Sequence, residues 1–151
     1  MTSSRSAASL PSGSGAAGDQ LRYATEVVAV GDLVPQFLEQ GVLVLFGEQA
    51  PEELHEFSVL HRPGSALSGP EPGDVLVIGT TELPVLAVGD VVAENLLQLG
   101  HLDIKADGRD EAAMPGDLCV PQVALPRVAP GDQIRILRGR AARAAREGDR
   151  A

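Results

Sequence analysis

The sequence predicts a mainly β fold, a compact small β-barrel or sandwich with one or two short helices. Short runs of apolar and β-branched residues recur along the chain and are separated by turns rich in glycine and proline. The tripeptide Pro-Gly-Asp occurs at Pro72, Pro115 and Pro130, each time just before an apolar run. Proline presets the first dihedral of a turn, glycine permits a positive φ and aspartate bonds its own backbone, so each copy is expected to lead into a strand.

The strands are expected where the apolar runs are short and bounded by turn residues. They are predicted over residues 23–30, 42–46, 57–61, 75–78, 83–88, 101–105, 118–120 and 134–137. The four residues 79–82 between two of these runs predict a hairpin with a short loop. Pro84 cannot donate a backbone hydrogen bond, so the second strand of this hairpin is expected at a sheet edge or a bulge.

Helix is sparse, with candidate segments over residues 32–40, 51–56 and 91–99. We expect Asp32 to cap the first segment and Pro51 to open the second. In the third segment Leu96 and Leu99 fall on the apolar face, and Gly100 stands where a left-handed residue ends a helix.

Composition and charge together divide the chain into three parts. Residues 1–20 are rich in Ser, Gly and Ala and are expected to be a disordered extension, residues 21–138 form the domain, and residues 139–151 form a basic, disordered tail. The formal net charge is −9, and without the last fourteen residues it is −12. An acidic body disfavours nucleic acid and anionic membranes and favours a basic protein partner, although simple solubility also explains it.

Composition excludes several classes of function. Aromatic residues make up 3% of the chain and Trp is absent, so there is no platform for stacking bases. Cys119 is the single cysteine, which excludes an internal disulfide and a cysteine zinc site; we expect it to be buried. The absence of a long apolar run and of a signal peptide predicts a cytoplasmic protein that does not span a membrane.

His61 is the main candidate for a reactive residue. The segment 50–64 predicts a short helical turn and then a strand that ends on His61, where Arg62 begins a turn toward solvent. This is where a nucleophilic imidazole would have to lie. From the residues alone the structural alternative is favoured, because Phe57, Val59 and His61 share one face of a strand and a lone histidine on such a face is more often a hydrogen-bonded core residue.

A set of short blocks around and after this histidine carries a family resemblance. The blocks are Ala50-Pro51, Leu54, Glu56-Phe57, Leu60-His61, Gly64, Val88-Gly89, Asn95-Leu96, Leu99-Gly100-His101 and Asp107-Gly108. In their order and spacing they resemble the glucitol/sorbitol-specific enzyme IIA component of the bacterial sugar phosphotransferase system, over residues 23–137. One position departs from the pattern, because Pro63 stands where members often have a second histidine.

The resemblance implies a phosphocarrier rather than a stand-alone enzyme. His61 would accept a phosphoryl group from the carrier protein HPr and pass it to a IIB component, working with IIB/IIC permease components at the membrane in the uptake of glucitol (sorbitol). Arg62 and the backbone near Gly64 are candidates for holding the phosphate, with a solvated arginine as the alternative for Arg62. Asn95 and His101 also match the family, and we expect structural hydrogen bonding from them. No cofactor and no metal is implied.

Two other classes of function remain open at this point. A regulatory or binding module without chemistry could use the same barrel, because a fold can persist after its reaction is lost. A barrel that binds a small molecule is the other alternative, which the scarcity of aromatic residues disfavours.

Overall fold

The computed structural model describes residues 20–139; the extension and the tail predicted from the sequence lie outside these residues, apart from their innermost residues Gln20 and Gly139. The strands are β1 (Leu21–Val30), β2 (Val42–Gly47), β3 (Val59–Ala66), β4 (Val75–Ile78), β5 (Thr81–Pro84), β6 (Ala87–Val88), β7 (Leu102–Lys105), β8 (Asp117–Cys119) and β9 (Gln133–Leu137). All nine join one sheet in the order β5-β4-β9-β1-β3-β2-β7-β8-β6.

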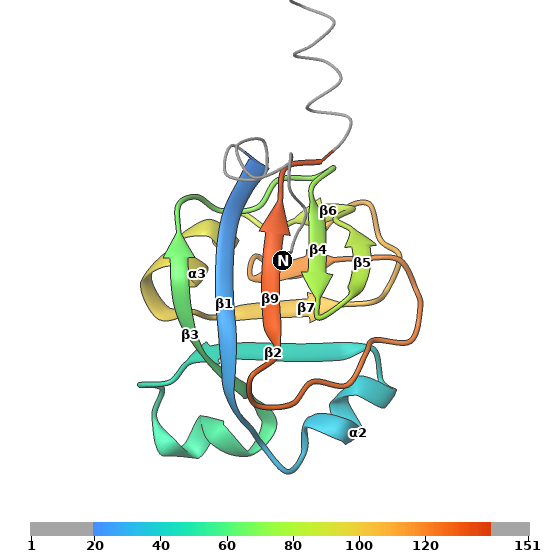
Figure 1. Cartoon of the computed structure of the whole chain (residues 1–151). Helices are drawn as coiled ribbons and strands as arrows, with labels where there is room; N and C mark the ends of the chain where they lie inside the picture. The colour runs from blue at the N-terminus through green and yellow to red at the C-terminus, as the bar shows by residue number, and fades with distance from the viewer. Residues whose placement is uncertain (1–19, 140–151) are drawn as a thin grey trace, which may run out of the picture.

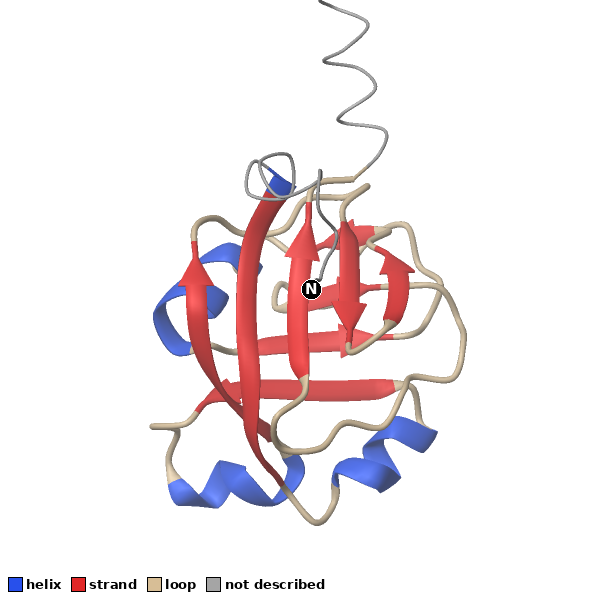
Figure 2. Cartoon of the chain, viewed as in Figure 1, coloured by secondary structure: helices blue, strands red, loops and turns tan. Residues whose placement is uncertain are grey.

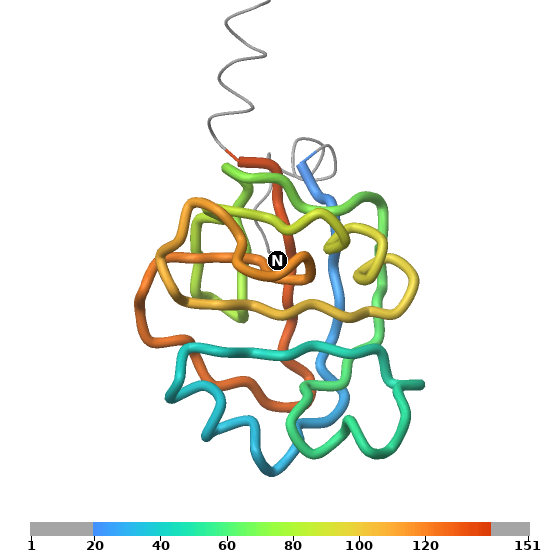
Figure 3. The backbone as a smooth tube through the Cα atoms, turned by 180° about the vertical axis from the view of Figure 1, so that it is seen from behind, coloured from blue at the N-terminus to red at the C-terminus, as the bar shows by residue number. Residues whose placement is uncertain are grey.

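The sheet is mixed and curls into a half-barrel. Strands β1, β9 and β4 stand upright in Figure 1, while β2 and β7 run across behind them. Figure 3 shows β2 and β7 side by side from the other direction, consistent with their antiparallel pairing. The β2–β3 and β7–β8 pairs are parallel and the others are antiparallel. The predicted mainly β class with few short helices is confirmed.

Aliphatic side chains on the concave face of this sheet form the core. Among the most deeply buried are Leu43, Leu45, Val59, Leu76, Leu102, Ile104, Leu118, Ile134 and Ile136. Cys119 is fully buried, as expected, and burial is the main cause that raises the pKa of its thiol to about 11. The thiol therefore behaves as a small apolar core group.

Short helical segments lie at the margins of the half-barrel: α2 (Val34–Glu39), the 3₁₀ segment η2 (Glu52–Phe57) and α3 (Val92–Leu99) (Figure 2). Gly100 ends α3 with a φ of 67°, as predicted. The expected cap at Asp32 is wrong, because Leu33 is the N-cap and no side chain bonds there. The prediction that Leu99 lies on the buried face of α3 is also wrong. Leu99 is 58% exposed, and only the earlier turns of α3 face the core.

The Pro-Gly-Asp turns lead into β4, β8 and β9, as predicted. In two of them glycine has a positive φ, 95° at Gly73 and 96° at Gly131. The carboxylates of Asp74 and Asp132 each accept the backbone N–H three residues upstream at 2.8 Å. The third copy differs, because Gly116 is not among the glycines with positive φ.

The hairpin and the edge proline are also confirmed. In this hairpin β4 pairs with β5 from Val75↔Pro84 to Ile78↔Thr81, around Gly79 with a φ of 62°. Pro84 lies on β5, the last strand at one end of the sheet, where its missing donor has no consequence for the ladder. The apolar run predicted over residues 83–88 is divided between β5 and β6.

The strand that carries His61 is longer than predicted and begins later. Phe57 belongs to η2, and β3 continues past His61 to Ala66. The reason is the ten-residue strand β1, which pairs with β3 from Val30↔Val59 to Tyr23↔Ala66. This ladder pairs the backbone N–H and C=O groups before and after His61, so the strand continues beyond this residue. His61 consequently lies within the sheet rather than at a strand end.

Candidate functional site

His61 is a core residue of the half-barrel, with 0% of its surface exposed. It lies between β1 and β2, because β3 pairs His61 with Val27 on one side and with Gly47 on the other. Its neighbour Val59, two residues earlier, is equally buried, as expected for one face of a strand. The prediction of a solvent-facing imidazole is therefore wrong, and the alternative of a hydrogen-bonded core histidine describes this conformation.

Both ring nitrogens of His61 are hydrogen-bonded. Nε2 lies 2.6 Å from the carbonyl oxygen of Gly100, and Nδ1 lies 2.6 Å from Oγ1 of Thr25. A carbonyl oxygen can only accept, so the neutral ring carries its proton on Nε2 and Nδ1 accepts the hydroxyl hydrogen of Thr25. A hydroxyl can also accept, so Thr25 is equally able to hold Nδ1 after the proton has moved to that nitrogen.

Alternation along β1 brings Thr25 to the ring. Tyr23, Thr25 and Val27 point to the same inner face and are at most 2% exposed. The Tyr23 ring meets the imidazole edge-on, with centroids 6.3 Å apart and planes at 66°. Burial raises the pKa of the Tyr23 hydroxyl to about 12, so this neighbour stays neutral.

The surroundings favour a neutral imidazole. Desolvation by burial is the main influence and lowers the pKa of His61, while the hydrogen bond to the Gly100 backbone acts in the opposite direction. A neutral ring is the form that can act as a nucleophile, because a lone pair must be available on the attacking nitrogen.

Two glycines form a thin wall beside Nε2. A Cβ atom on Gly100 would lie 2.8 Å from the nitrogen of Gly47 and 3.1 Å from Nε2 of His61, and one on Gly47 would lie 3.0 Å from the Leu99 carbonyl oxygen. Side chains at either position would push the backbones apart. The two glycines therefore let the end of α3 approach β2 closely enough to cover the imidazole.

An apolar groove of about 460 Å³ lies outside this wall, and Gly47 and Gly100 are part of its lining. We call it the α3–η2 groove. Apolar side chains from both elements and from β3 line it, among them Pro51, Leu54, Pro63, Leu96, Leu97 and Leu99. A smaller hollow of about 300 Å³ lies on the Nδ1 side and includes Thr25, Arg62 and Gly64.

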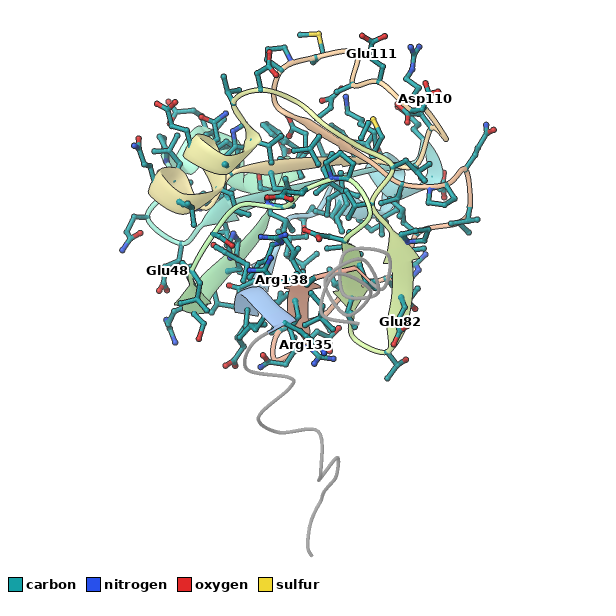
Figure 4. All side chains as sticks on the ribbon, turned by 90° about the horizontal axis from the view of Figure 1, so that it is seen from above. Glu48, Glu82, Asp110, Glu111, Arg135 and Arg138 are labelled. Atoms are coloured by element: carbon teal, nitrogen blue, oxygen red, sulfur yellow. The ribbon has the colours of Figure 1, made fainter. Side chains whose placement is uncertain are left out.

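Arg62 and Gly64 lie on the exposed part of β3, and the hydrogen bonds of the His61 ring go to other residues. Arg62 donates from Nε and Nη2 to the two carboxylate oxygens of Glu48 at 2.7 and 3.0 Å. This bond lowers the pKa of Glu48, which lies at the rim of the molecule beside β3 in Figure 4. Gly64 is the extra residue of a β-bulge against β1, and a Cβ there would have room, so glycine is not required by close packing.

The other two matching residues take structural positions. His101 stacks on Phe46 with centroids 4.1 Å apart, and its Nε2 lies 3.1 Å from Oδ1 of Asp103. Asn95 is half-buried in α3, and its backbone carbonyl accepts the N–H of His101. The bond at Asn95 is made by its backbone, so the role of its side-chain amide stays a prediction, as does the structural role of His101. His55 is half-buried and bonds the carbonyl oxygen of Ala50 through Nε2.

Sequence reasoning missed the two partners that hold the ring. Thr25 lies 36 residues before His61, and Gly100 was recognised only as a helix terminator. The pairing of β1 with β3 was needed to place Thr25 beside the ring. Within residues 20–139, no cluster of three His, Cys, Asp or Glu side chains could hold a metal ion. None of the helices described there is long and apolar enough to cross a bilayer.

Comparisons with known proteins agree with the resemblance seen in the sequence. A family model described as the PTS system glucitol/sorbitol-specific IIA component matches residues 22–135. The glucitol/sorbitol-specific EIIA components of Shigella flexneri and Escherichia coli K12 are each 33% identical over 114 residues, covering 76% of this chain and 93% of theirs.

A solved structure shares the fold. The crystal structure of a PTS system IIA component from Enterococcus faecalis V583 superposes with a TM-score of 0.63 at 23% identity, covering 76% of this chain and 98% of that one. Together with the family match over most of the domain, this leaves one assignment: the chain belongs to the family of glucitol/sorbitol-specific IIA components of the phosphotransferase system.

Proposed function

We propose that this protein is a cytoplasmic phosphocarrier that accepts a phosphoryl group on His61 from phospho-HPr. It passes the group to a IIB component during uptake of glucitol (sorbitol) through the associated IIC permease. Family membership supports the phosphocarrier role, and the observation that carries the assignment to His61 is a buried, neutral imidazole held at both nitrogens beside an apolar groove.

The geometry favours Nε2 as the reacting nitrogen. Nε2 faces the glycine wall and the larger groove, whereas Nδ1 is held by Thr25 inside the sheet. For Nε2 to attack, its proton must leave and Nδ1 must carry one, with the Thr25 hydroxyl turning from donor to acceptor. The Nε2 lone pair then forms the new N–P bond as the N–P bond of the donor breaks and returns its electron pair to the donor imidazole.

Transfer also requires the contact between Nε2 and Gly100 to open. The carbonyl oxygen of Gly100 occupies the line along which a phosphorus atom would approach Nε2. Gly100 has no Cβ that would oppose rotation of this peptide, and the rotation also breaks the bond from the His101 N–H to the Asn95 carbonyl oxygen. The described conformation is therefore the closed state of the carrier.

The test is incubation with phosphoenolpyruvate, enzyme I and HPr, followed by intact-mass and peptide analysis under alkaline conditions. We expect one added phosphoryl group mapped to His61 and none on His61→Ala. The matched controls His55→Ala and His101→Ala should still be phosphorylated, because these imidazoles bond structural partners elsewhere. Circular dichroism confirms that each variant is folded.

The burial of His61 favours one other candidate, a regulatory or binding module that keeps the barrel without the reaction. In that case both ring nitrogens would serve only to stabilise the core. A folded protein that gains no phosphoryl group from active phospho-HPr, yet still binds HPr, would establish this second candidate and exclude the first.

A further inference from the structure

We propose that the α3–η2 groove is the docking surface for the phosphoryl-donor protein, and that its occupant is an apolar side chain surrounded by basic residues. This inference rests on the proposed function, because it assigns the partner that delivers the phosphoryl group to His61.

The groove is placed where a donor must bind. Gly47 and Gly100 line the groove, and a Cβ atom on Gly100 would lie only 3.1 Å from Nε2 of His61. A protein seated in the groove would touch Leu99 and Gly100, the segment whose carbonyl oxygen covers Nε2. Docking and uncovering of the imidazole would then occur at the same place.

The lining of the groove is typical of a surface that is covered in a complex. Leu97 and Leu99 are 42% and 58% exposed, although both are large apolar side chains on a short helix. Pro51 and Leu54 face them from η2, and Pro63 adds an apolar contact from β3. Apolar side chains gathered around a concave site are typical of the anchoring pockets of protein interfaces.

The charges around the groove are predominantly negative. Glu52 and Glu53 are exposed on η2 between the lining residues Pro51 and Leu54. On α3, Glu94 precedes Leu97 and Gln98 by three and four residues, so it lies on the same side of the helix.

The basic residue next to the groove lining in the sequence already forms an ion pair. Arg62, which precedes the lining residue Pro63, is paired with Glu48 at 2.7 Å. The carboxylates on η2 and α3 therefore present a negative field that complements a basic partner and repels an acidic one.

The experiment compares Leu97→Lys with Val123→Lys. Val123 is also an exposed apolar residue, at 46%, and does not line the groove, so it is the control for an added lysine. Binding of unphosphorylated HPr is titrated calorimetrically, transfer from phospho-HPr is followed by quench flow, and His61 is phosphorylated separately with phosphoramidate. The small molecule needs no docking surface, so it reports the reactivity of His61 alone.

We expect Leu97→Lys to weaken HPr binding and lower the second-order transfer rate about tenfold or more, the size of a substitution at an interface anchor. Its labelling by phosphoramidate should equal that of the wild type, and Val123→Lys should behave as the wild type in all three measurements. Unchanged HPr binding and transfer in Leu97→Lys would refute the docking surface and leave the phosphocarrier role intact.

Two further outcomes separate the hypotheses. A wild-type protein that is not phosphorylated by either donor contradicts the proposed function, while the calorimetric titration still decides whether HPr binds the groove. A defect of Leu97→Lys that is confined to onward transfer to IIB would show that the groove binds the acceptor and would overturn its assignment to the donor.

Discussion

Replacing Thr25 with valine should separate the structural from the chemical role of the bond to His61. The two side chains have nearly the same shape, so the change removes the hydroxyl without opening a cavity. Thr25 is 2% exposed, and its Oγ1 lies 2.6 Å from Nδ1 of His61. In the variant Nδ1 is a buried acceptor without a donor, and the added methyl group of valine occupies the place of the hydroxyl.

The cost can be worked from these contacts. An unsatisfied buried acceptor costs about 1–3 kcal/mol, and burial of the added methyl group offsets about 0.8 kcal/mol. We therefore expect Thr25→Val to lose up to about 2 kcal/mol of unfolding free energy. With a urea m-value of about 2 kcal/mol per molar, the unfolding midpoint should fall by up to about 1 M.

Phosphoryl transfer should be affected differently from stability. Reaction at Nε2 needs the tautomer with a proton on Nδ1, and valine cannot accept that hydrogen bond. If the tautomer with a proton on Nδ1 is destabilised by about 1.4 kcal/mol relative to the other, transfer from phospho-HPr should be about tenfold slower. The control Thr25→Ser loses a buried methyl group and some stability but keeps the hydroxyl, so its transfer rate should stay within about threefold of the wild type.

The pattern across the two variants is what tests the reasoning. Urea unfolding gives the stability, quench flow gives the rate, and the imidazole ¹⁵N shifts give the tautomer of His61. If Thr25→Val transfers phosphate as fast as the wild type, or if Thr25→Ser is impaired equally, the hydroxyl does not position the reacting tautomer and the assignment is refuted.

Two more predictions follow from the same site. Burial lowers the pKa of His61 in the folded state, so between that value and the unfolded value of about 6.5 the unfolded chain binds more protons. Unfolding free energy should therefore fall as pH drops through this window, by up to about 1.4 kcal/mol per pH unit. Urea titrations at several pH values should show a weaker dependence in His61→Gln, and an equal dependence would contradict a depressed pKa. Gly100→Ala should destabilise the fold more than Gly73→Ala, measured by thermal unfolding, because both have positive φ but only at Gly100 would Cβ collide with Gly47. Equal losses would mean that the wall has room for a side chain.

Local pattern was enough to predict most elements of the fold. Strand positions followed from short apolar runs between turns, and Gly100 and Pro84 marked a helix end and an edge strand correctly. These features depend on residues close together in the chain. Leu99 and Asp32 were misassigned because a helical period or a capping preference cannot show where the rest of the core lies.

The site could not be derived in the same way, because it is made by pairings between distant segments. The ten-residue strand β1 extends β3 beyond His61 and brings Thr25 to its ring, while the end of α3 covers the other nitrogen. Residue types around His61 were compatible with either an exposed strand end or a core position. The ladder with β1 decides between them, and no local pattern in the sequence specifies strand order.

The burial of His61 and a role in phosphoryl transfer are compatible on energetic grounds. The bond between Nε2 and Gly100 closes the site, and rotation of that peptide also breaks the bond from the His101 N–H to Asn95. With exposure to water, losing the two hydrogen bonds costs about 1–3 kcal/mol. Leu99 is already 58% exposed, so moving this end of α3 gives up little apolar contact. Gly100 has no Cβ that would oppose rotation of its peptide. An open state within about 1–3 kcal/mol would be populated at about 1–10% before any partner binds. A partner in the α3–η2 groove would then need to stabilise that state only modestly, while the closed state would keep the imidazole neutral and shield it from water.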